Sequence, residues 1–128
     1  MPNLTGVSHI SLSVRDRDVS VRWYVDVLGF AVVADMDEDR WKRSVCLDPS
    51  GIMLSLTEHQ NPKPFDYGNM GVDHISFGVS DRSMLDEWQE RFTELGVVHS
   101  PVVDSPYGSV LSFSDPNGIA LELFHLGG

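Results

Sequence analysis

Hydrophobic and polar residues alternate with a period of two in a pair of similar stretches, residues 6–14 and 71–79. Both begin Gly-Val-x-His-Ile-Ser, and an Asp-Arg pair follows each of them. A period of two places successive side chains on opposite faces of a sheet, so each stretch is predicted to be a strand. His9 then shares a face with Ser11, and His74 shares a face with Ser76. Because the second copy begins about half a chain length after the first, the pattern indicates an internal duplication.

A second pair of similar segments lies near the end of each half of the chain. Asp-Pro-Ser-Gly at 48–51 and Asp-Pro-Asn-Gly at 115–118 are typical of turns. Each is followed by a predicted strand, at 52–57 and at 119–124. Aligning the two halves places Ser55 at the position of Glu122.

Helical periodicity follows the first strand of each half. Asp16 or Asp18 is expected to cap the first helix, and Asp81 or Ser83 the second. Gly29 and Gly96 are expected to end them. The apolar stripes, in which the two tryptophans are expected to pack as core residues, are Val19, Trp23, Val27 and Leu28 in the first helix and Leu85, Trp88, Phe92 and Leu95 in the second.

The remaining strands complete two equivalent modules. They are predicted at 30–34, 41–47, 97–103 and 109–114, with an acidic turn at 35–39 and a turn at 105–108. Each half therefore reads strand, helix, strand, strand, strand, and the fold class is α+β. We expect one domain over residues 1–128, with module one at about 5–59, a linker at about 60–70 and module two at about 71–126.

Composition narrows the function classes. The 128 residues are 41% hydrophobic and 22% charged, with a net charge of −10 and no Lys or Arg after Arg91. This balance argues against a nucleic-acid partner. No apolar run approaches the length of a membrane span, so no membrane partner is expected. The single Cys46 and the absence of a leader pattern favour a cytoplasmic location.

These motifs, in this order and twice over, resemble the vicinal oxygen chelate superfamily, over residues Val7 to Phe124. That superfamily includes glyoxalase I, extradiol ring-cleaving dioxygenases, fosfomycin-resistance proteins and bleomycin-binding proteins. The resemblance implies two βαβββ modules that form a cup-shaped, curled mixed sheet with the helices outside. It also implies that the two modules of one cup come from one chain or, after exchange, from two. We expect a homodimer, because each small module leaves sheet edges that pairing would cover.

The resemblance places metal ligands on the first and last strands of each module, at His9, Ser55, His74 and Glu122. Three of these residues are ligand types, and the serine is not. Two imidazoles and one carboxylate with open positions are typical of non-haem Fe(II), although Mn, Zn or Ni also fit. The alternative is that the histidines are hydrogen-bonded structural residues and Glu122 an exposed carboxylate.

The function that the resemblance implies is a metal-dependent enzyme whose small substrate chelates the metal through vicinal oxygens, as in extradiol dioxygenases. A glyoxalase I-like lyase is one alternative, but it is expected to have Glu at Ser55. Fosfomycin-type thiol transfer is another, and it needs cationic groups near the metal. A metal-free, antibiotic-binding protein of the bleomycin-resistance type is the third.

Two further residues are candidates for catalysis. His59 follows the last strand of module one, near the place where the dioxygenase resemblance implies an acid or base, and imidazole both accepts and donates protons near neutral pH. Tyr107 lies in a Gly-containing turn that is able to reach a substrate. Arg43 shares a strand face with Trp41, so it points either into the cup or into solvent.

Overall fold

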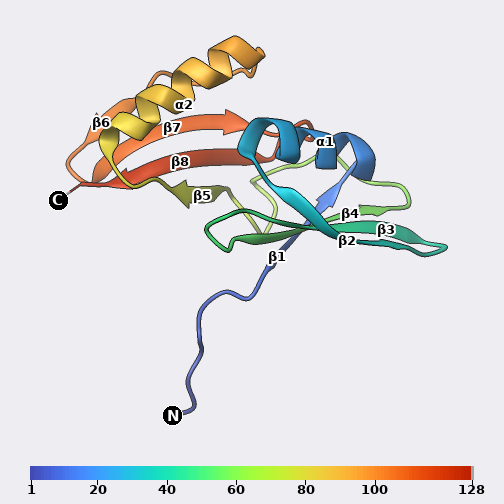
Figure 1. Cartoon of the computed structure of the whole chain (residues 1–128). Coiled ribbons are helices and arrows are strands. Elements are labelled where there is room, and N and C mark those ends of the chain that lie inside the picture. Colours follow the sequence, from blue (N-terminus) through green and yellow to red (C-terminus); the bar gives the residue numbers. More distant parts are fainter. Residues whose placement is uncertain (128) are drawn as a thin grey trace. The chain divides into compact units, whose positions relative to one another are not determined.

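The computed structural model describes residues 1–127, which form two compact units that divide between Lys63 and Pro64. Each unit contains one helix and a four-stranded mixed sheet, and in each the helix lies on one face of its own sheet (Figure 1). The predicted α+β class and the two βαβββ modules are therefore confirmed.

The first unit contains β1 (Ile10–Val14), α1 (Arg17–Leu28), β2 (Ala31–Asp37), β3 (Trp41–Leu47) and β4 (Met53–His59). Its sheet has the order β1-β4-β3-β2. The first strand pairs with β4 in parallel, and the other pairs are antiparallel.

The second unit contains β5 (Ile75–Gly78), α2 (Arg82–Leu95), β6 (Val103–Ser105), β7 (Gly108–Ser114) and β8 (Ala120–Leu126). Its order is β5-β8-β7-β6, with β5 parallel to β8. The two units thus repeat one topology, as the duplicated phrases predict.

Both helices begin and end where the sequence predicts. The Asp16 carboxylate accepts a hydrogen bond from the Val19 N–H at 3.0 Å, and Asp81 accepts one from Met84 at 3.2 Å. These bonds satisfy backbone donors that have no partner inside the helix. Gly29 ends α1 with a φ of 83°, a left-handed conformation that costs glycine little.

The core of the first unit lies between α1 and the sheet. Leu12, Leu54 and Leu56 point toward the helix, and Tyr24 of α1 is fully buried. The sequence favoured Trp23 as the core aromatic, but Trp23 is only partly buried and packs edge-on against Tyr24 at 4.9 Å between ring centroids. The wide apolar stripe of α1 includes both positions, so periodicity alone did not distinguish them.

In the second unit the same layer is built around Phe92, which is fully buried. Its ring centroid lies 4.6 Å from that of Phe113 on β7. Trp88 is partly buried and lies beside Phe92, with ring centroids 5.6 Å apart. Of the predicted stripe, Leu85 and Phe92 are fully buried and Trp88 partly so, whereas Leu95 at the end of the helix is 48% exposed and is a correction to the prediction.

Several strand boundaries differ from the prediction. Strand β2 continues through residues 35–37, where an acidic turn was expected, because Asp35 accepts a hydrogen bond from the Ser44 hydroxyl and Asp37 pairs with Arg17. Over residues 97–103 the expected strand is wrong. His99 makes an isolated bridge to Phe113, and β6 begins only at Val103, beyond Pro101, which has no N–H to donate.

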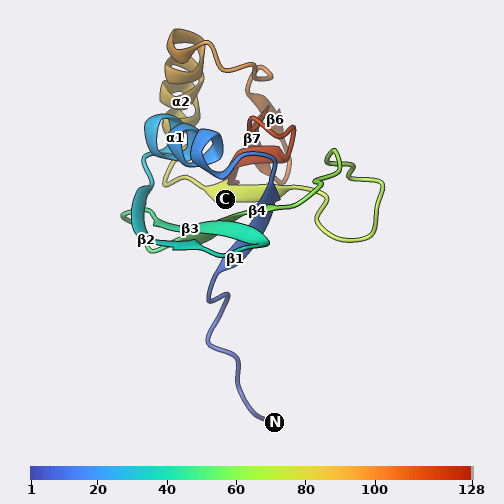
Figure 2. The ribbon, with the colours of Figure 1, turned by 90° about the vertical axis from the view of Figure 1, so that its right-hand side faces the viewer.

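The two histidine phrases are also less regular than predicted, because β1 and β5 begin only at Ile10 and Ile75. His9 and His74 therefore each lie just before a strand. Residues 60–74 contain no helix or strand and form an irregular loop after β4 (Figure 2). Neither helix within residues 1–127 has the length and hydrophobicity needed to cross a membrane.

Candidate functional site

Each sheet has a near face, which packs on the helix of its own unit, and a far face, which points away from that helix. The near face of the first unit includes Ser44, Leu56 and Glu58, since the Arg17 N–H donates to Glu58 at 2.9 Å. Register then assigns the alternate positions to the far face. These are Ser11, Ser13, Ala31, Ala34, Met36, Trp41, Arg43, Val45, Leu47, Met53, Ser55, Thr57 and His59.

In the second unit, His74 and Glu122 lie close together on the far face. Ser76 and Ser112 are the register neighbours of Glu122 on either side, and His74 precedes Ser76 by one period of two. The Nε2 atom of His74 lies 3.5 Å from Oε1 of Glu122. Ligand atoms about 2.1 Å from a shared ion lie roughly 3.0–3.4 Å apart, so this spacing is only slightly longer than that between two ligands of one metal ion.

Asp73 fixes the orientation of the His74 ring. Its carboxylate lies 2.7 Å from Nδ1, and because a carboxylate only accepts, Nδ1 carries a proton, so Nε2 is the nitrogen that is able to bind a metal once it is deprotonated. This hydrogen bond raises the pKa of His74 above its ordinary value, against the effect of desolvation, and the charge of Glu122 adds to the rise. A carboxylate behind the imidazole is a common orienting device in metal sites.

His9 has a similar environment in the first unit. The hydroxyl of Ser8, the preceding residue, lies 3.0 Å from its Nδ1 atom. In both units, therefore, the residue before the histidine engages Nδ1 and leaves Nε2 for another partner. The duplication thus extends to the side-chain contacts of the two rings.

Ser55 occupies in its unit the position of Glu122. It is the register partner of Ser11 on β1, as Glu122 is of Ser76 on β5. Ser55 is 5% exposed, and a hydroxyl is a poor replacement for a carboxylate ligand. The first unit therefore contributes one ligand-type residue, His9, where the second contributes two.

Within either unit, considered over residues 1–127, no three His, Cys, Asp or Glu side chains are grouped as a complete metal site. The structure brings together His74 and Glu122, and the joining of His9 to them stays a prediction. Both histidine side chains are exposed, and the Glu122 side chain is 23% exposed. All three are accessible to an ion.

A polar cluster that the sequence did not predict as a unit lies on the far face of the first sheet. Arg43 donates from Nε to the Thr57 hydroxyl at 2.8 Å, and Thr57 lies 3.3 Å from the Ser11 hydroxyl. The guanidinium carbon of Arg43 lies 4.5 Å from the centroid of the Trp41 ring. The sequence shows only that Trp41 and Arg43 are two residues apart and so share a strand face. The pairing of β1, β3 and β4, which brings the cluster together, is not visible in it.

The two catalytic candidates have different surroundings. His59 is the register partner of Trp41 and shares the far face with Arg43, although its side chain is exposed. Tyr107 is 81% exposed and lies in the turn before β7, five residues before Ser112. That separation is about 17 Å along a strand, so the structure does not bring Tyr107 next to Glu122. Both catalytic roles stay predictions.

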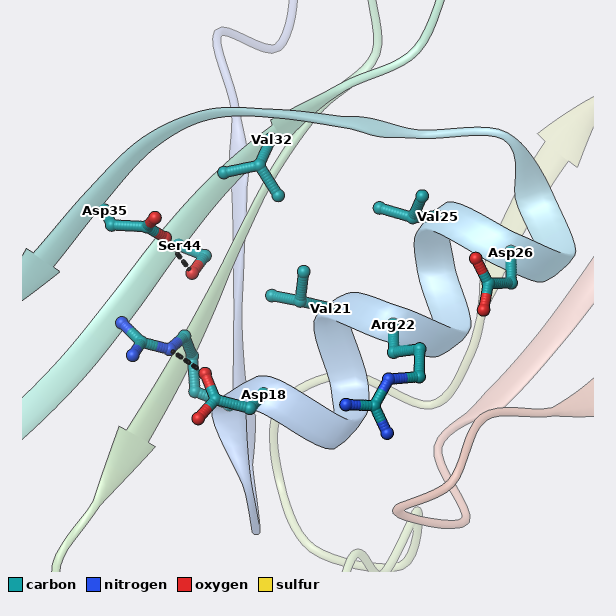
Figure 3. Close-up of a pocket in the computed structure, with 9 residues that line it drawn as sticks. Asp18, Val21, Arg22, Val25, Asp26, Val32, Asp35 and Ser44 are labelled. Atoms are coloured by element: carbon teal, nitrogen blue, oxygen red, sulfur yellow. Dashed lines mark hydrogen bonds and ion pairs between the residues drawn. The ribbon is translucent and has the colours of Figure 1, made fainter.

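An open cavity of about 540 Å³ lies on the near face of the first sheet, between α1 and β2. Val21, Val25 and Val32 line its apolar part, and Asp35 lies at one end, bonded to Ser44 (Figure 3). This cavity is on the opposite side of the sheet from Ser11 and Arg43. It is therefore separate from the candidate site.

Comparison with known proteins agrees with this architecture. The model of the Glyoxalase/Bleomycin resistance protein/Dioxygenase superfamily matches residues 6–123. A crystal structure of a glyoxylase/bleomycin resistance protein/dioxygenase domain from Frankia sp. EAN1pec is 35% identical, with a TM-score of 0.92, and the match covers 98% of this chain and 94% of that one.

Two relatives of known sequence are named for different reactions. The putative ring-cleaving dioxygenase MhqA of Bacillus subtilis is 28% identical over 92% of this chain, which spans only 39% of that protein. The metallothiol transferase FosB of Staphylococcus haemolyticus is 28% identical over 94% of this chain and 83% of its own length. With the family model matching nearly the whole sequence, this chain belongs to the Glyoxalase/Bleomycin resistance protein/Dioxygenase superfamily.

Proposed function

We propose that this protein is a divalent-metal-dependent enzyme whose small substrate binds the metal through two adjacent oxygens, and that its reaction is ring cleavage of the extradiol dioxygenase type. The observation that carries the proposal is the 3.5 Å separation of His74 Nε2 and Glu122 Oε1. His9, at the equivalent place in the first unit, is proposed as the third ligand.

The donor set fits such an ion. Two neutral imidazoles and one carboxylate suit Fe(II), which is the metal we propose, while Mn, Zn and Ni accept the same donors. A bound Fe(II) would supply Lewis acidity and oxygen activation. Ser55 adds no carboxylate, which leaves room for substrate and argues against glyoxalase chemistry.

Residues of the chain itself supply orientation and proton transfer. Asp73 holds the His74 ring with Nε2 directed to Glu122. The small side chains of Ser76 and Ser112 leave space on both sides of Glu122. His59, beside Trp41, is proposed to accept a proton from a substrate hydroxyl at its imidazole nitrogen and to return it later.

The experiment is elemental analysis of protein reconstituted with Fe(II) under nitrogen, followed by oxygen-uptake measurements on a panel of catechols. Glu122→Gln removes the ligand charge, and Glu87→Gln on the exposed side of α2 is the matched control. We expect metal and oxygen uptake in wild type and control, and at least a tenfold loss of both in Glu122→Gln. Bound metal without oxygen uptake on any catechol contradicts the dioxygenase proposal.

Thiol transfer is the second candidate, because the FosB match covers 83% of that protein whereas the MhqA match covers 39%. The discriminating measurement is the metal-dependent consumption of a thiol in the presence of an epoxide. A positive result there, combined with no oxygen uptake, favours transfer.

We also propose a homodimer with two equivalent sites. Every residue of β2 is exposed in the described chain, including Val32 and Val33, and an uncovered edge strand of this kind favours pairing. Mixing His9→Ala with His74→Ala chains distinguishes the two assemblies. Exchanged modules restore intact sites in the mixed dimer, about a quarter of all sites after random mixing, and unexchanged modules restore none.

A further inference from the structure

The Arg43 side chain, on the far face of the first sheet, is held by neighbouring side chains but has no acidic partner among the described residues. Arg17 and Arg82 form ion pairs with Asp37 and Asp104. For Arg43, by contrast, the described residues provide no carboxylate within ion-pair distance, and only its Nε is bonded, to Thr57. The two terminal guanidinium nitrogens are thus available.

Two contacts hold the Arg43 head group in place. Thr57, which is 1% exposed, accepts the Nε hydrogen, and the Trp41 ring lies beneath the guanidinium. A guanidinium fixed in this way loses little conformational entropy when it binds an anion through its planar fork. The arrangement is preorganised for a planar, two-oxygen acceptor such as a carboxylate.

The charge distribution of the sheet favours such a ligand. The chain has 19 acidic residues and a net charge of −10, yet no strand position on this far face is Asp or Glu. The acidic residues of the same strands, Asp35, Asp37 and Glu58, belong to the near face. The far face is therefore a locally cationic surface in an acidic protein.

This surface is connected to the proposed metal ligand within the same unit. Ser11 lies 3.3 Å from Thr57, and His9 precedes Ser11 by one period of two, about 7 Å along the strand direction. His9 and the Arg43 fork are thus on the same side of the first sheet, joined by the contacts of Ser11 with Thr57 and of Thr57 with Arg43.

We infer that Arg43, held by Thr57 and Trp41, binds a carboxylate substituent of the substrate. The substrate class is then a carboxylated aromatic vicinal diol and not an unsubstituted catechol. This inference rests on the proposed function for the role of the diol, but the carboxylate contact is tested independently of turnover.

The test is calorimetric titration of 3,4-dihydroxybenzoate and of 3,4-dihydroxybenzamide, which differ in the charged group, under nitrogen with and without Fe(II). In wild type we expect at least tenfold tighter binding of the carboxylate. Arg43→Gln is expected to abolish this preference while leaving the amide affinity and the bound metal unchanged. Arg22→Gln, on the exposed side of α1, makes the same change in net charge and is expected to keep the preference.

Two variants separate recognition from folding. Arg43→Lys keeps the charge without the planar fork, and Thr57→Val removes the Nε acceptor. Both are expected to retain part of the preference, with wild-type melting curves. A wild type without preference, or a preference that survives in Arg43→Gln, overturns the inference. A preference that depends on Arg43 in a protein that binds no metal leaves the inference standing and contradicts the proposed function.

Discussion

Ser55 on β4 and Glu122 on β8 occupy the same position in the two units, each as the register partner of a serine on the neighbouring parallel strand. One copy of the module thus has a carboxylate where the other has a hydroxyl. In a duplicated fold this is a difference in donor set at an otherwise equivalent position.

Replacing Ser55 with Glu tests that difference. We expect the variant to bind metal at least as tightly as wild type and to lose oxygen uptake at least tenfold, because the added carboxylate fills a position that the substrate needs. Calorimetric metal titration and an oxygen electrode provide the measurements. Ser55→Gln has the same size without the charge and is expected to bind metal no more tightly than wild type. Wild-type oxygen uptake in Ser55→Glu contradicts the proposal that the substrate needs the metal position next to Ser55.

Asp73→Asn tests the orientation of His74. The hydrogen bond to Asp73 raises the pKa of His74, so the variant is expected to show a lower pKa in an NMR titration of the imidazole. Metal affinity is expected to fall on the order of 10–100-fold. Glu87→Gln makes the same change in net charge elsewhere, and it is expected to leave both quantities unchanged.

The raised pKa of His74 also sets the pH dependence of stability and binding. In the metal-free protein, the charged ring stabilises the fold fully below the ordinary histidine value of about 6.5, and this contribution is lost as the pH rises through the raised pKa. A proton competes with the metal at Nε2. As the pH is lowered, metal affinity should therefore begin to fall at a higher pH in wild type than in Asp73→Asn. If both proteins begin to lose metal affinity at the same pH, the proposed role of Asp73 is contradicted.

Phe92→Ala tests the core of the second unit. Phe92 is fully buried against Phe113, so its truncation should lower the free energy of unfolding by about 3–5 kcal/mol. Leu95→Ala, in the same helix but 48% exposed, should cost less than about 1 kcal/mol. Urea unfolding followed by circular dichroism measures both. Equal effects of the two substitutions contradict the observed packing.

The proposed dimer predicts a sedimenting species of twice the chain mass of 14.3 kDa at micromolar concentration. Replacing the exposed Val33 on β2 with Lys should weaken the assembly if this edge takes part. Lys in place of Val98, which is also exposed but lies outside the strands, is the control. A monomer at all concentrations contradicts the dimer.

The sequence predicted what depends on local pattern. Alternation around Ile10 and Ile75 located the strands, and Asp16 with Gly29 bounded the first helix, because these signals act over a few residues. It did not predict that β2 extends to Asp37, since the partners of that acidic run, Ser44 and Arg17, are brought there only by folding.

The candidate site was predictable to the same extent. Duplication placed His74 and Glu122 on the first and last strands of the second module, and the structure brings them within 3.5 Å because β5 and β8 pair in parallel, with Ser76 opposite Glu122. The Arg43 cluster required the order of three strands, which parity alone does not give. Its residues come from β1, β3 and β4, far apart in the sequence.

The central claim is that His9 joins His74 and Glu122 in holding one metal ion. Its most direct test is the metal content per chain of His9→Ala after reconstitution with Fe(II), measured by elemental analysis beside wild type and the control variant His125→Ala, which changes a histidine outside the proposed site. The account predicts one ion per chain in wild type and His125→Ala, and a loss of at least tenfold in His9→Ala. Wild-type metal content in His9→Ala contradicts it.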